Sequence, residues 1–149
     1  MHLKRRPSAL LKIANILLIS ILFFACSQPE LGPEPLAGFF ERVTALVTTT
    51  VRGQLRDNPP KQTLLAAQLP SFEKMVTMNQ LMEELKGIDP LKNLAYLIEA
   101  DIMFELQKPE HHYERSNFNS PEVQRQLVSA ILAGMKKAIG QLKEGKDGT

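Results

Sequence analysis

The chain has 149 residues, 18 Lys and Arg against 16 Asp and Glu, and one cysteine, Cys26. This length supports one small domain with a single hydrophobic core. A lone cysteine excludes a disulfide within one molecule, so the domain must be held together by its core.

Residues 1–25 have the layout of a secretory signal peptide. Basic residues at 4–6 and at Lys12 precede an uncharged, mainly apolar block of thirteen residues, Ile13 to Ala25. A helix of that length spans about 20 Å, against about 30 Å of bilayer hydrocarbon, and Lys12 interrupts any longer span. We therefore interpret this segment as a signal that is removed, and not as a membrane-spanning helix.

The apolar block ends in LFFAC, residues 22–26, which resembles the lipobox of bacterial lipoproteins. In that family the cysteine receives a diacylglycerol and an N-acyl chain and becomes the new N-terminus. The family usually has Leu or another aliphatic residue three positions before the cysteine, where this chain has Phe23, with Leu22 displaced by one. An Asp after the cysteine tends to hold family members at the inner membrane. Ser27 therefore implies the outer membrane, with the protein facing the periplasm. The resemblance implies lipidation of Cys26 and a stable membrane anchor.

Loss of the signal changes the charge balance. Four basic residues precede Cys26 and no acidic residue does, so the remaining chain carries 14 basic against 16 acidic residues. The basic excess belongs to the targeting segment. We therefore expect no nucleic-acid partner.

Residues 26–35 are expected to form the acylated cysteine and an extended tether, because SQPELGPEP contains three prolines and one glycine. A helical domain is predicted over 36–146, where apolar residues recur at three- and four-residue steps. The first helix is predicted over 36–55, and DNPP at 57–60 ends it because the residue before a proline avoids helical geometry.

The next two helices are marked by prolines and one glycine. The second is predicted from Pro60 to a C-cap at Gly87, with Pro70 either kinking the helix or starting a new one. The third is predicted to start with Asp89 as its N-cap and to end before Pro109.

The fourth helix is predicted to start with Ser120 as its N-cap and Pro121 in its first turn. Together these signals predict an all-α fold, a small antiparallel bundle of about four helices. Small residues recur every four positions at Ala130, Gly134 and Ala138, and a second glycine lies at Gly140. Close approach of a neighbouring helix would offset the low helix propensity of both glycines. Tight packing within the domain is the favoured interpretation, and a groove for a partner helix is the alternative.

Two carboxylates fall on the side of the third helix that we expect to be buried. The apolar seam of this helix continues into Asp101 and Glu105, one turn apart. Paired carboxylates can serve general acid–base chemistry. The favoured interpretation is structural: the end of the helix emerges from the bundle there, with Arg115 or Arg125 as a counter-ion, because ion pairs perturb such groups as readily as catalytic sites do.

Residues 109–118, PEHHYERSNF, are interpreted as a loop. His111 and His112 are adjacent and cannot face one metal ion from a regular helix, so no metal site is expected. Tyr113, Arg115 and Phe118 are residue types that anchor protein interfaces, which makes them the predicted partner contacts.

The sequence contains no P-loop, HExxH, GxSxG or GxGxxG motif, and we expect a protein that is not an enzyme. Its predicted function is that of an accessory, assembly or pilot factor that binds another envelope protein. The alternative is a carrier that holds a lipid or small apolar ligand between its Met- and Phe-rich faces. An enzyme using Asp101 and Glu105 ranks third. The sequence leaves open whether the chain forms a homo-oligomer.

Overall fold

A computed structural model describes residues 34–145, with side chains from residue 38 onward. Every regular element in this part of the chain is helical, which confirms the predicted all-α class. The predicted signal peptide and Cys26 lie outside the described residues. The tether was expected to reach residue 35, but the first helix already begins at Glu34. The elements are α2 (Glu34–Leu55), α3 (Pro59–Phe72), α4 (Met78–Gly87), η1 (Asp89–Leu91), α5 (Lys92–Leu106), η2 (Pro109–His111), α6 (His112–Ser116) and α7 (Pro121–Glu144).

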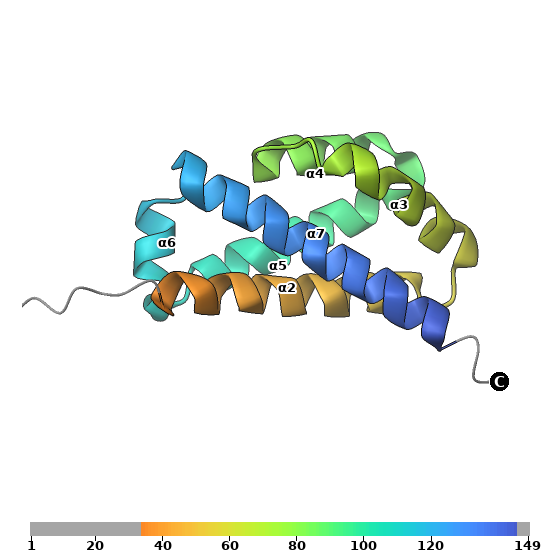
Figure 1. The fold of residues 1–149 in the computed structure, drawn as a ribbon, viewed down its shortest axis with the longest axis horizontal. Helices are drawn as coiled ribbons and strands as arrows, with labels where there is room; N and C mark the ends of the chain where they lie inside the picture. Colours follow the sequence, from red (N-terminus) through yellow and green to blue (C-terminus); the bar gives the residue numbers. More distant parts are fainter. Residues whose placement is uncertain (1–33, 146–149) are drawn as a thin grey trace, which may run out of the picture. The chain divides into compact units, whose positions relative to one another are not determined.

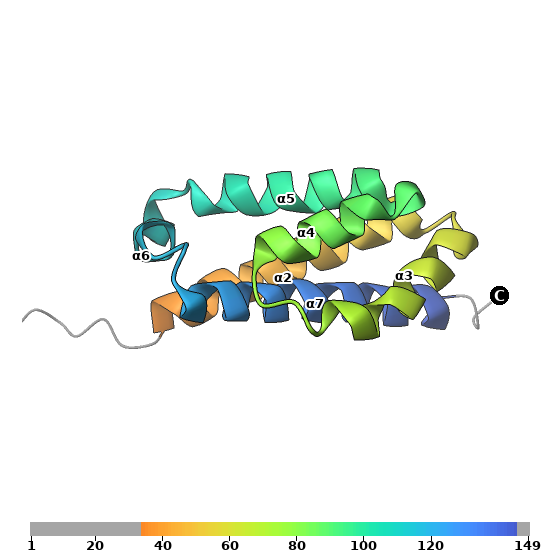
Figure 2. The same ribbon diagram turned by 90° about the horizontal axis from the view of Figure 1, so that it is seen from above.

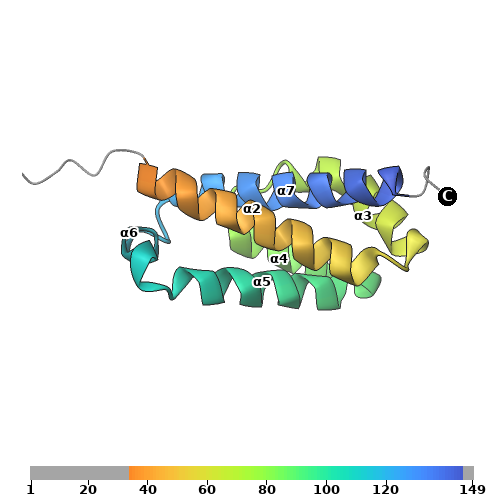
Figure 3. The ribbon, with the colours of Figure 1, turned by 90° about the horizontal axis from the view of Figure 1, so that it is seen from below.

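Three long helices form the centre of the domain (Figures 1 and 3). Helices α2 and α7 lie side by side and run in the same direction. Two hydrogen bonds show this direction: Thr44 Oγ1 donates to Ala130 O, and Thr48 Oγ1, four residues later, donates to Gly134 O, also four residues later. Helix α5 runs in the opposite direction to α2. Asp101 contacts Thr50, whereas Glu105, one turn further along α5, contacts Arg42, which comes earlier in α2.

The predicted second helix is two helices, and the break differs from the prediction. Pro70 lies inside α3, which continues to Phe72, and α4 starts after Thr77, whose side chain accepts from Gln80 N at 3.2 Å. The chain reverses direction between α3 and α4 (Figure 2). This additional reversal inverts every later helix, so α7 runs parallel to α2, and the expected four-helix antiparallel arrangement is not what the described residues form.

The predicted helix ends had mixed outcomes. Ser120 caps α7 as predicted, accepting from Val123 N at 3.3 Å. Asp89 does not cap α5, because residues 89–91 form the 3-10 turn η1 and α5 starts at Lys92. Gly87 is the last residue of α4, with Ile88 as its cap, and no described glycine has a positive φ. Residues 109–118 are not a loop, since they contain η2 and α6.

The contact between α2 and α7 is unusually close at Gly134. A methyl group on this residue would lie 2.7 Å from Val47 Cβ and 2.8 Å from Thr44 O. Ala130, Gly134 and Ala138 are all buried, which confirms tight packing within the domain. The same reason does not apply to Gly140, because no atom of another element lies within 4 Å of its position.

The apolar core is continuous across the long helices and both halves of the split helix. Met78 and Met82 belong to it, whereas Met103 is 39 % exposed. No helix among the described residues is long and apolar enough to cross a membrane. The largest fully buried side chains are Phe39, Leu55, Leu65, Phe72, Leu81, Met82, Leu85, Leu91, Ile98, Ile102, Leu127 and Ile131.

Candidate functional site

A buried ionic cluster lies where the end of α5 meets the start of α2. Its centre is Glu105, whose side chain is only 5 % exposed. One carboxylate oxygen, Oε2, contacts Lys108 Nζ at 2.6 Å. The other, Oε1, contacts His111 Nε2 at 3.1 Å and Arg42 Nη1 at 3.4 Å. Arg42 also reaches Glu110 at 3.2 Å, so the cluster joins α2, α5 and η2.

The surroundings of Glu105 hold it in its charged form. Burial raises the pKa of this carboxyl, but the hydrogen bonds from Lys108 and His111, the Lys108 charge and the Arg42 guanidinium outweigh burial. The pKa of Glu105 therefore lies below its usual value of 4.5. Glu105 is thus an anion compensated by neighbouring cations, which is the arrangement of a structural ion pair.

Glu114 extends the cluster into α6. Its side chain is fully buried, and neither carboxylate oxygen has a hydrogen-bond partner. The nearest basic group is His111 Nδ1, 4.0 Å from Oε2. The His111 ring also packs against Phe39 of α2, with ring centroids 4.9 Å apart. The contacts of His111 with Glu105 and Phe39 hold η2 against the α2–α5 end of the domain, and α6 follows it with Glu114 buried there.

Asp101 and Glu105, the predicted carboxylate pair, have different environments. Asp101 is partly exposed and accepts a hydrogen bond from Thr50 Oγ1 at 2.5 Å. The expectation that the helix end emerges from the bundle is wrong at Glu105, whose side chain is buried. The expected counter-ions are also wrong. Arg115 donates to the carbonyls of Leu106 and Gln107, and Arg125 pairs with Glu122 at 3.9 Å. The two carboxylates therefore have no shared partner, and Glu105 alone is charge-compensated in the interior.

The three predicted partner contacts differ in accessibility. Tyr113 is 50 % exposed on α6. Arg115 is partly exposed, and its guanidinium is engaged with the end of α5. Phe118 packs partly buried against the core. Only Tyr113 combines an aromatic side chain with free access from solvent.

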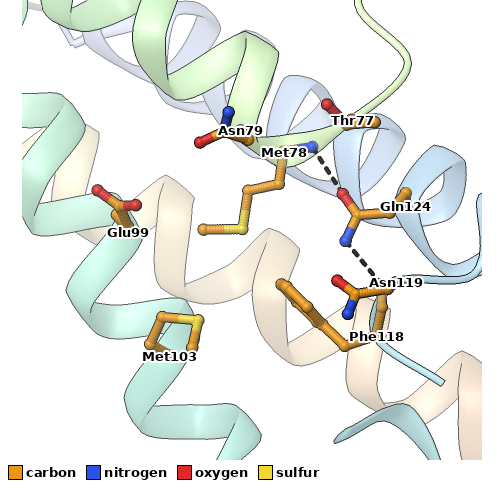
Figure 4. Close-up of a pocket in the computed structure, with 8 residues that line it drawn as sticks. All are labelled: Thr77, Met78, Asn79, Glu99, Met103, Phe118, Asn119 and Gln124. Atoms are coloured by element: carbon orange, nitrogen blue, oxygen red, sulfur yellow. Dashed lines mark hydrogen bonds between the residues drawn. The ribbon is translucent and has the colours of Figure 1, made fainter. Parts of the chain in front are cut away.

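Phe118 also lines a pocket of about 300 Å³ between α4, α5 and the start of α7 (Figure 4). Gln124 crosses its floor, accepting from Met78 N at 2.9 Å and donating to Phe118 O at 2.7 Å. Met103 and Glu99 border the pocket from α5, and Glu99 pairs with Lys86 at 2.9 Å. The lining is therefore mixed, and its main polar groups are already bonded within the chain.

The outward side of α5 is apolar as well as the inward side. Tyr96, Leu97, Met103 and Phe104 are 49 %, 40 %, 39 % and 73 % exposed, and exposed Ala100 lies between them. We call these five residues the α5 outer face. A helix that is apolar on both sides normally has a neighbour on each. The sequence carried this signal, because the five residues recur at helical spacing without a charge among them.

Other members of the ionic cluster had no such signal. Arg42 lies 63 positions from Glu105, and nothing in its local pattern indicates that they meet. Glu114 stands among polar residues and is buried only because α6 packs on the cluster. Only the contact with Lys108 could have been predicted from the sequence, because Lys108 lies three residues after Glu105, a spacing that places both on the same side of a helix.

Within residues 34–145, no three His, Cys, Asp or Glu side chains are arranged to hold a metal ion. No family model, curated protein or solved structure matches the chain.

Proposed function

We propose that the chain is a lipid-anchored accessory factor of the bacterial outer membrane, facing the periplasm, that binds another envelope protein. The observation that supports the binding role is the solvent exposure of the Tyr113 side chain. This residue is half exposed on a short helix that a buried ionic cluster fastens to the domain. A rigidly held aromatic side chain loses little conformational entropy when it enters a partner's pocket.

The arrangement of charges favours binding over catalysis. Glu105 is surrounded by Arg42, Lys108 and His111, and Asp101 is bonded to Thr50. Neither carboxylate lines the pocket of about 300 Å³. A general acid or base needs access to its substrate, so these bonds support a structural role for both groups.

The form of the pocket favours binding over a carrier role. A cavity for an apolar ligand is usually lined mainly by hydrophobic side chains. Here Thr77, Asn79, Glu99, Asn119 and Gln124 contribute polar groups to the lining (Figure 4). A larger hollow of about 480 Å³ is also mixed, because charged residues line it beside apolar ones: Glu73, Arg125 and Lys136 beside Met75, Val76, Val128 and Leu132. The large apolar side chains instead fill the core, where Phe39, Phe72 and Met82 are fully buried.

The chain's only two tyrosines provide a matched test of the binding role. Tyr113 and Tyr96 are 50 % and 49 % exposed, on α6 and α5 respectively. We expect Tyr113→Ala to weaken capture of the co-purifying envelope protein by about thirtyfold, the loss typical of an interface anchor. Tyr96→Ala, in the α5 outer face, should leave capture per chain unchanged when the extracts are diluted until the parent chain is monomeric. The measurement is quantitative mass spectrometry after mild detergent extraction of the tagged, full-length protein.

Equal capture by both tyrosine variants would place the contact elsewhere. Thermal unfolding of Tyr113→Ala should match that of the parent, because its ring is half exposed. Tyr96→Ala also removes the contact of its ring with Lys86 Nζ, 5.0 Å from the ring centroid, and should unfold at a slightly lower temperature. Phe118→Ala is a poorer probe, since Phe118 packs against the core and its loss would also destabilise the domain.

The anchor has its own test at Cys26. We expect Cys26→Ser to keep the signal segment, to migrate as the longer precursor and to incorporate no labelled fatty acid. Ser27→Asp is the matched control: it should be lipidated normally but fractionate with the inner membrane. Fatty-acid labelling of Cys26→Ser at the parental level would contradict the lipoprotein assignment.

A further inference from the structure

The α5 outer face has a two-fold pattern centred on Ala100. Tyr96 lies four positions before Ala100 and Phe104 lies four positions after it. Leu97 and Met103 lie three positions before and after. The face is therefore a sequence of aromatic, aliphatic, small, aliphatic and aromatic residues that reads the same in both directions.

The pattern continues at both ends. Asn93 and Gln107 lie seven positions before and after Ala100, are exposed and carry the same amide group. The complete stripe from Asn93 to Gln107 contains no charged residue. An interface between two identical copies related by a two-fold axis has to be self-complementary in this sense, since residue i meets j while j meets i.

We propose that the α5 outer face pairs with the same face of a second copy of this chain. The two α5 helices run antiparallel and cross at Ala100, whose small side chain allows close approach. Tyr96 then packs on Met103 of the second copy, and Leu97 on Phe104 of the second copy. Asn93 and Gln107 of the second copy meet at each end, where their amides can hydrogen-bond to one another.

The charges beside this face are compatible with such pairing. Glu99 and Asp101 flank Ala100, one on each side of the stripe. Glu99 pairs with Lys86 at 2.9 Å and Asp101 accepts from Thr50 at 2.5 Å, so both carboxylates have partners within their own chain. Lys86 Nζ also lies 5.0 Å from the centroid of the Tyr96 ring, so this cation and its partner Glu99 border the face as a pair. Pairing two copies therefore leaves neither carboxylate without a partner.

The exposed area sets the strength of the association. The α5 outer face offers roughly 400 Å² of apolar surface. This area is similar to that of the largest apolar patch on a typical monomer, and it is about half of the area that each partner buries in a standard interface. We expect a dimer that dissociates on dilution and is favoured where chains are concentrated on one membrane. This inference uses a different surface from Tyr113 and does not depend on the proposed function.

Cysteine cross-linking in native membranes tests both the partner and the register. With helix axes 8–10 Å apart, the two Ala100 Cα atoms would lie about 4 to 5 Å apart, within disulfide range. The two Asn93 Cα atoms would be separated by about 20 Å along the helices. We expect Ala100→Cys in the full-length chain to form at least fivefold more covalent dimer under mild oxidation than Asn93→Cys. The parent chain, with Cys26 alone, gives the background.

Three results would overturn the proposal. These are equal cross-linking by Ala100→Cys and Asn93→Cys, no product above background, and a product whose mass is not twice that of the chain. The last result would show that a different protein covers the α5 outer face.

A second measurement separates this proposal from the Tyr113 contact. Ala100→Glu places two carboxylates at the two-fold axis, and we expect it to weaken the dimer at least tenfold in detergent, measured by light scattering across a dilution series. Tyr113→Ala should leave the dimer intact. Ala100 is exposed, so the thermal unfolding of Ala100→Glu should match that of the parent. A parental dimer in Ala100→Glu would contradict the proposed axis.

Discussion

Gly134→Ala is expected to destabilise the domain by about 2 kcal/mol, although alanine is the better helix former. The added methyl group would meet Val47 Cβ at 2.7 Å and Thr44 O at 2.8 Å. The second contact is with backbone and cannot be relieved by rotating a side chain. Helices α2 and α7 must therefore separate, which weakens the hydrogen bonds from Thr44 to Ala130 O and from Thr48 to Gly134 O. Urea or thermal unfolding measures the change.

Gly140→Ala is the matched control in the same helix. No atom of another element lies within 4 Å of a methyl group at Gly140. The substitution should therefore follow helix propensity and stabilise the domain by about 0.5 to 1 kcal/mol. Opposite signs for the two glycines are expected. Stabilisation by both substitutions would contradict the close contact of α2 with α7.

Glu105→Gln is expected to cost about 2 kcal/mol of folding stability at neutral pH. The substitution removes a charge that Lys108 contacts at 2.6 Å, His111 at 3.1 Å and Arg42 at 3.4 Å. Arg42 and Lys108 are 53 % and 38 % exposed, so water can compensate them in the variant and the cost stays moderate. Glu110→Gln is the control, because Glu110 shares Arg42 but is half exposed, and little change is expected.

The loss of folding stability caused by Glu105→Gln should become smaller as the pH falls. The pKa of Glu105 is lower in the folded protein than its usual value of 4.5. Its contribution is therefore complete above about pH 4.5 and is lost as the pH falls through the lowered folded value. The stability difference between parent and variant should shrink as the pH drops below that range. A difference that grows on acidification would show that Glu105 is not held as an anion.

The same cluster explains how the Tyr113 contact would be presented. Residues 109–118 are polar and contain one proline, and the sequence favoured a loop there. Burial of His111 and Glu114 against α2 and α5 instead orders them as η2 and α6. Loosening of this segment in Glu105→Gln would be visible as faster amide exchange in α6 than in α7.

Capping signals in the sequence predicted the start of α7 but not the start of α5, where residues 89–91 form the 3-10 turn η1. Ser120 followed by Pro121 marks the start of α7, because the hydroxyl satisfies a free N–H and the proline has none to satisfy. The apolar spacing predicted the buried face of α5, but it did not distinguish Glu105, which is buried, from Asp101, which is partly exposed. Pro70 was misleading because a proline breaks a helix only where packing permits. Here α3 continues for two residues past Pro70 and buries Phe72.

The sequence by itself determined the helical class and most helix positions, since these follow from three- to four-residue periodicity and capping chemistry. It also contained the two-fold pattern of the α5 outer face, although only the structure shows that this face is exposed. Tertiary structure decided the reversal between α3 and α4, the parallel packing of α7 on α2 and the contact of Arg42 with Glu105. These depend on contacts between residues as much as 86 positions apart, which no local pattern encodes.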